Sequence, residues 1–114
     1  MSVTDEAIVQ ATYQAATNTI VGFLQPHTHQ RRIKLMAVNG PSGSTLKIYR
    51  GYNAGGHGTP INTVFPAFAR TYDADREGSP MDIWPGQALT FVWSGGTTAA
   101  GGTGTATVTS TVTN

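Results

Sequence analysis

The chain has 114 residues, a formal net charge of +1 and 11% charged residues, about half the share usual in soluble domains. This length predicts a single domain, and the near-neutral charge argues against a nucleic-acid binder, because phosphate neutralisation requires a basic excess. Cysteine is absent, which excludes disulfides, thiolate metal sites and cysteine nucleophiles, and no apolar run is long enough to cross a membrane.

Runs of alternating apolar and polar residues, separated by turn residues, predict β-strands along the whole chain. Residues 1–6 are expected to form a short N-terminal arm. The predicted strands follow in chain order, at residues 7–16, 19–24, 31–38, 45–49, 61–72, 81–84, 88–93 and 105–113. For the first of these strands a helix remains an alternative, since alanine and glutamine favour helices.

Two of these segments carry the clearest local signals. The sequence Asn-Gly-Pro-Ser-Gly at residues 39–43 predicts a hairpin turn between the strands at 31–38 and 45–49. Threonine occupies every second position of residues 105–113, so this last strand is expected to present a threonine ladder outward. An exposed strand of this kind could also pair with the sheet of a neighbouring molecule.

Eight predicted strands, short connections and no long helix are typical of all-β proteins. We therefore expect an all-β fold, a single antiparallel β-sandwich of jelly-roll or immunoglobulin-like type with seven to eight short strands. It would occupy residues 1–114 as one domain, because no internal repeat or linker divides the chain.

The sequence His27-Thr28-His29 is the sharpest candidate for metal binding. If this segment is a strand, both imidazoles point the same way and could meet one metal ion, or the axis of a trimer. No third ligand lies nearby in the sequence, and the segment follows a proline. The favoured interpretation is therefore a polar loop with two solvated histidines, and no metal or other cofactor is predicted.

A second candidate is the acidic segment that contains Asp73, Asp75 and Glu77. Carboxylates at alternate positions before a glycine resemble part of a calcium loop. However, Arg76 interrupts the pattern, and the bidentate glutamate expected near the end of such a loop is missing. We expect a solvated loop with an internal Asp–Arg pair.

Two further segments offer surfaces for contact. The cluster of Arg31, Arg32 and Lys34 could hold a phosphate or an acidic neighbour, although a solvated face is the favoured interpretation. Arg32 and Lys34 are expected opposite Ile33 and Leu35, which suits an exposed strand edge. The glycine-rich loop at 51–59 fits no phosphate-binding template, and it is expected to be a hairpin loop or a mobile loop that orders on contact.

The aromatic residues allow a different class of function. Trp84 and Trp93, with Tyr49 and Tyr52, could stack on sugars in a carbohydrate-binding module, although both tryptophans are expected in the core. No nucleophile motif is present, and the few carboxylates cluster in one loop. We therefore expect the protein not to be an enzyme.

The overall pattern resembles small β-sandwich accessory proteins of tailed bacteriophage particles. Two parts of the chain carry the resemblance: the runs at residues 17–21, 31–35, 37–39 and 46–51, and the run at residues 83–96. Within the latter, the sequence Pro-Gly-Gln-Ala-Leu-Thr-Phe-Val-Trp is similar to a Pro-Gly-x-x-Leu-x-Phe-x-Trp strand of such proteins. There it precedes a glycine-rich turn and a final strand rich in threonine, alanine and valine.

The resemblance implies a structural protein of the virion, made in the cytoplasm of the bacterial host. The leading hypothesis is a homo-oligomeric capsid decoration protein that binds the major capsid protein or other virion proteins. It would bind through loops and strand edges, and the low surface charge fits a surface covered by neighbours. The expected contact residues are Arg31, Arg32, Tyr52, His57, Asp73, Asp75 and Arg76. The alternatives are a component of the head–tail neck or tail, the carbohydrate-binding module, and a trimeric spike piece with metal on the two histidines.

Overall fold

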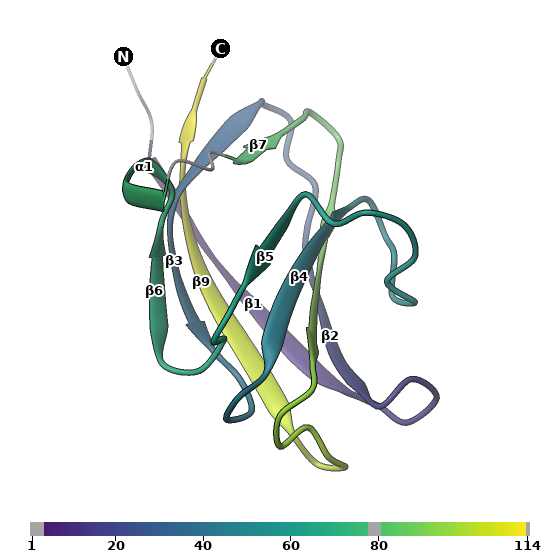
Figure 1. Cartoon of the computed structure of the whole chain (residues 1–114). Helices are drawn as coiled ribbons and strands as arrows, with labels where there is room; N and C mark the ends of the chain where they lie inside the picture. Colours follow the sequence, from purple (N-terminus) through teal and green to yellow (C-terminus); the bar gives the residue numbers. More distant parts are fainter. Residues whose placement is uncertain (1–3, 78–80, 114) are drawn as a thin grey trace.

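The computed structural model describes residues 4–77 and 81–113 and is built almost entirely of antiparallel strands (Figure 1). This confirms the predicted all-β class, with nine strands in place of seven to eight. The elements are β1 (Thr4–Gln14), β2 (Thr19–Leu24), β3 (Arg31–Asn39), β4 (Thr45–Arg50), β5 (Asn62–Val64), β6 (Arg70–Asp73), α1 (Ala74–Glu77), β7 (Met81–Ile83), β8 (Leu89–Ser94) and β9 (Thr103–Val112). No helix of the described residues is long and apolar enough to cross a membrane.

All nine strands belong to one sheet, in the order β5-β4-β8-β2-β1-β9-β3-β6, with β7 also paired to β3. The sheet curls around its core until its two ends approach each other, so the two layers of the predicted sandwich are parts of one nearly closed barrel (Figure 1). Asn62 of β5 links these ends, because its side-chain amide donates a hydrogen bond of 2.7 Å to the Tyr72 hydroxyl of β6.

The core follows from strand alternation. In β9 the threonines are exposed or half-buried, whereas the residues between them up to Ser110 are buried, which confirms the predicted ladder. In β8 both Phe91 and Trp93 are fully buried, with ring centroids 6.3 Å apart. Gly104 and Gly40 lie against the Trp93 ring, where a Cβ atom would come within 3.1 and 2.4 Å of it.

Two predictions about strand ends and edges differ from the structure. Residues 4–6, expected in the N-terminal arm, belong to β1 and pair with β9; residues 1–3 lie outside the described residues. The predicted strand at 105–113 is not a free edge, because β9 pairs with β1 on one side and with β3 on the other. Pairing on both sides of β9 depends on strands that are distant in the sequence, so the alternation within residues 105–113 does not reveal it.

The alternation predicted for β3 is wrong in its second half. Arg31 and Ile33 point inward, but a register shift between Ile33 and Leu35 then moves Met36 and Val38 into the core. Leu35, expected on the inner face, is consequently exposed. One extra residue in a strand reverses the inside–outside pattern beyond it, which explains the error.

Candidate interaction surfaces

In the described part of the chain, the longest stretch of unpaired strand edge lies where β1 separates from β2. One edge of β1 pairs with β9 from Thr4 to Thr12, but β2 pairs with β1 only from Thr12 to Gln14. Beyond Gly22, which packs directly against Ala11, the two strands diverge (Figure 1). Within the described residues, no strand pairs with the second edge of β1 from Thr4 to Ala11.

A pocket of about 230 Å³ occupies this opening between β1 and β2. Its walls come from β1, from the end of β2 with the following loop, and from Arg31 of β3. Ile8 and Phe23 contribute apolar surface, and Ile8 is itself 63% exposed although it lies in a strand. Pockets that bind ligands combine apolar walls with a few polar groups, as this one does.

Arg31, one of the expected contact residues, is buried. Its side chain points into the end of the barrel because it shares the inner face of β3 with Ile33. Its Nη1 atom donates to the Asp5 carboxylate at 3.1 Å, whereas its Nε and Nη2 atoms are buried and have no partner within residues 4–77 and 81–113. The Ser110 hydroxyl, on the residue of β9 that pairs with Asp5, is also buried and unpartnered.

Arg32 lies on the outer face of β3, as predicted, and is engaged by a carboxylate of the same chain. Its Nε and Nη2 atoms donate to both oxygens of Asp82, at 2.7 and 3.3 Å. The hydrogen bond from Arg32 lowers the pKa of Asp82 below its ordinary value, while partial burial opposes this shift and the charges of Arg32 and Arg50 add to it. The positive charge of Arg32 is therefore already compensated by a carboxylate of the same chain.

Trp84 lies at the surface, so its predicted place in the core is wrong. It is 50% exposed, and the Arg50 guanidinium lies 4.2 Å from the centre of its ring. The same guanidinium donates to the Asp82 carbonyl oxygen at 2.7 Å, which holds Arg50 over the ring. Trp93 and Tyr49 are buried, so only two of the four aromatic residues considered for sugar stacking are accessible.

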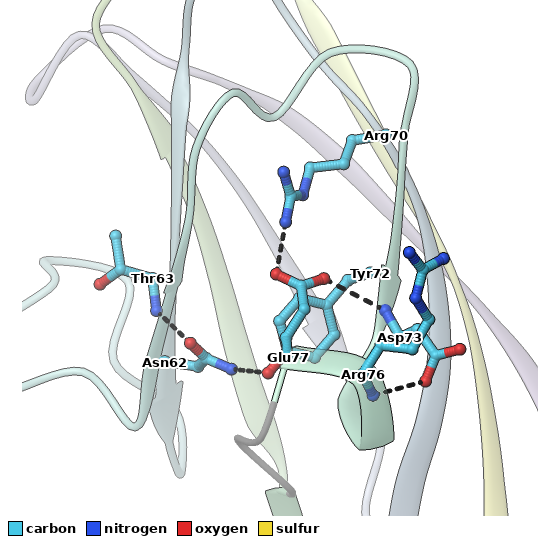
Figure 2. Close-up of polar contacts among 7 residues, drawn as sticks. All are labelled: Asn62, Thr63, Arg70, Tyr72, Asp73, Arg76 and Glu77. Carbon is cyan, nitrogen blue, oxygen red and sulfur yellow. Dashed lines mark hydrogen bonds and ion pairs between the residues drawn. The ribbon is translucent and has the colours of Figure 1, made fainter.

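The acidic segment forms a capped helical turn in place of the expected loop (Figure 2). The Asp73 carboxylate accepts a hydrogen bond of 3.2 Å from the Arg76 amide, and Glu77 accepts one of 3.3 Å from the Asp73 amide. Glu77 also forms an ion pair with Arg70. Two of the carboxylates considered for calcium are thus engaged by donors of this chain. The side chain of Asp75 lies outside the described part.

His27 and His29 lie in the loop between β2 and β3, as the favoured interpretation predicted. Their ring centroids are 5.7 Å apart. The Nδ1 atom of His27 accepts a hydrogen bond of 3.2 Å from the His29 amide, and Nδ1 of His29 lies 3.0 Å from the Thr28 hydroxyl. Among the described residues, no group of three His, Cys, Asp or Glu side chains could hold a metal ion.

The glycine-rich loop after β4 folds back over the outer face of β4, β8 and β2. The Asn53 side chain closes it by two hydrogen bonds to the backbone of His57, at 3.0 and 2.8 Å, and the Asn53 amide donates to Thr90. Tyr52, which is 64% exposed, contacts Phe23 edge to face at 5.4 Å. Tyr52 therefore extends the apolar surface beside the pocket, while His57 is exposed in the same loop.

The predicted contact residues do not form one surface. Arg31 and Tyr52 flank the opening between β1 and β2, whereas Arg32, Asp73 and Arg76 lie along the outer side of β3 and β6. The prediction missed Ile8, although its place on the polar face of the first strand was a usable signal. Comparisons with family models, curated proteins and solved structures give no match. The resemblance to bacteriophage accessory proteins stays a prediction.

Proposed function

We propose that this protein is a non-enzymatic structural component of an assembly, in which neighbouring subunits bind at the opening between β1 and β2. Following the resemblance, the assembly is a tailed-bacteriophage virion and the protein decorates its capsid as a homo-oligomer. The observation that supports the proposal most is the unpaired edge of β1, which runs beside the exposed side chain of Ile8.

Unpaired strand edges recruit other strands, because their amide and carbonyl groups lack partners. Natural proteins usually protect such edges with charged side chains or prolines. Here Ile8, Ala7 and Val9 follow one another at the edge, and only Asp5 and Glu6 near its start are charged. The two outermost strands of the sheet are short, at three and four residues, and Asn62 joins them. The β1 edge is thus the better surface for an extended partner segment.

Low charge supports the same proposal. A surface that stays in solvent usually carries more charged residues than the 11% of this chain. The charges near the opening are further reduced, since Asp5 and Arg31 pair with each other. A neighbour that covers this region would therefore bury few uncompensated charges.

Light scattering and sedimentation with purified particles test the proposal. We expect the protein to be oligomeric and to bind particles assembled without it. The substitution Ile8→Lys should weaken binding at least about tenfold, because a lysine at the edge disfavours strand addition. Leu35→Lys replaces another exposed aliphatic residue, on the outer face of β3, and should leave binding unchanged. A monomer at all concentrations that does not bind particles would refute the proposal.

The position of the protein in the particle separates capsid decoration from the alternative role in the neck or tail. A decoration protein is present in a copy number that follows the capsid lattice, whereas a neck or tail protein follows the symmetry of those parts. Quantitative mass spectrometry of purified particles measures this ratio directly.

A further inference from the structure

The guanidinium of Arg31 carries the strongest unexplained feature of the molecule. Arg31 is 2% exposed, yet among the residues that the structure describes only its Nη1 atom has a partner, the Asp5 carboxylate. Buried donors without partners are rare in folded proteins, and each one destabilises the fold. An arginine retained in this state needs an explanation other than stability.

The two unpartnered atoms lie on one side of the guanidinium group. Nε and Nη2 form the edge from which arginine donates two parallel hydrogen bonds to a carboxylate. Asp5 does not use this edge, because it accepts from Nη1 alone at 3.1 Å. Arg31 therefore retains a pair of donors in the arrangement that matches the two oxygens of a second carboxylate.

Arg31 also lines the pocket between β1 and β2, so its buried charge lies next to a space of about 230 Å³. Apolar groups of Ile8, Phe23 and Leu24 form much of the wall. A buried arginine with two covered, unpartnered donors thus lies beside a small and partly apolar pocket.

From these observations we infer that the pocket binds a carboxylate that carries a short apolar group, with its two oxygens on Nε and Nη2 of Arg31. Suitable ligands are a free short-chain carboxylic acid or the C-terminal residue of another chain, which share this chemistry. The inference is independent of the proposed function, since it concerns a small ligand and holds for a monomer.

Two features of the site shape this binding. Nε and Nη2 are covered from solvent, so the ligand must move side chains of the pocket wall; Ile8 and Phe23, which are not fully buried, have room to move. The Asp5 carboxylate repels the ligand, but it is half-exposed, and solvent therefore screens its charge. His27 lies on the loop side of the pocket and supplies no negative charge.

Hexanoate is a suitable probe, and hexanamide is its uncharged control. We expect hexanoate to shift the NMR signal of the Arg31 Nε–H group saturably, together with the amides of Ala7, Ile8 and Phe23. Hexanamide should cause no such shift. A peptide that ends in leucine with a free carboxylate, compared with the same peptide amidated, tests the second source of the ligand. Binding of either carboxylate and not of its neutral form supports the inference.

Variants separate binding from folding. Arg31→Gln should weaken hexanoate binding by about tenfold or more, because the charged pair of donors is lost. Arg32→Gln makes the same change outside the pocket and should have no effect. If Arg31→Gln does not fold, Asp5→Asn provides a second test, since removal of the repelling charge should tighten hexanoate binding. Absence of a saturable shift with both carboxylates, or equal shifts with the neutral forms, would overturn the inference.

Discussion

Replacement of Arg31 by methionine should make the protein more stable. Methionine retains an unbranched apolar stem of similar length, and it removes two buried nitrogen atoms that have no hydrogen-bond partner. Each unsatisfied buried donor costs about 1–3 kcal/mol. The substitution also removes the pair with Asp5, whose side chain is 42% exposed, so that this loss is about 1 kcal/mol or less. We therefore expect a gain of at least about 1 kcal/mol in the free energy of unfolding.

Replacement of the partner should have the opposite effect. Asp5→Asn leaves the buried guanidinium of Arg31 without a counter-charge, and we expect a loss of about 2 kcal/mol or more. Urea denaturation measures both effects, provided that the slope with denaturant stays constant between variants. Arg32→Met is the matched control, because it removes an arginine from an exposed pair and should change stability by about 1 kcal/mol or less.

The directions in which Arg31→Met and Asp5→Asn change the free energy of unfolding show whether the buried guanidinium destabilises the fold. If Arg31→Met destabilises the protein while Asp5→Asn does not, the buried guanidinium stabilises the fold. Arg31 would then be a structural residue, and the reason to assign it a ligand would disappear.

Three further substitutions test other parts of the structure. Gly40→Ala places a Cβ atom 2.4 Å from the Trp93 ring, which is fully buried, and should lower the unfolding free energy by about 1–3 kcal/mol in urea denaturation; an unchanged midpoint would contradict this packing. Asn53→Ala should lower stability by about 0.5–1.5 kcal/mol and speed hydrogen exchange in the loop that Asn53 closes; unchanged exchange would refute that role. Because the folded-state pKa of Asp82 lies below its unfolded value, its ionised form stabilises the fold above about pH 4, and this contribution is lost as the pH falls through the folded pKa. The difference in stability between the parent chain and Asp82→Asn should therefore shrink in acid, and a constant difference from neutral pH to pH 2 would contradict the Arg32 pair.

The strands and turns that depend only on residues adjacent in the sequence could be predicted from the sequence pattern. Alternation in residues 105–113 gives both the strand β9 and the side of it that faces solvent, because each inward residue is small or apolar and each outward one is threonine. The glycines and proline at residues 39–43 end β3 and begin β4 where the pattern places this break. The predicted hairpin is nevertheless wrong: β4 pairs with β5 and β8, whereas β3 pairs with β6, β7 and β9.

Features that depend on distant residues were not predictable. The reversed pattern in β3 arises from a bulge against β9, and the exposure of Trp84 arises from Arg50, which lies 34 positions earlier in the sequence. The opening beside β1 exists because β2 leaves it to follow β8, a pairing that no local pattern contains. The capped turn at Asp73 is different, since aspartate is a common N-cap residue and the acidic residues at 75 and 77 fall in the turn that follows, which could have suggested a helix start.

Hydrogen exchange along β1 tests the central claim of an interaction surface at this opening most directly. Amides that point from β1 toward the opening should exchange readily in the isolated protein and become protected when the protein is bound to its assembly. Amides of β1 that bond to β9 should be protected in both states and provide the internal reference. If assembly protects other surfaces and leaves the exchange of Thr4 to Ala11 unchanged, the β1 edge is not the interaction surface.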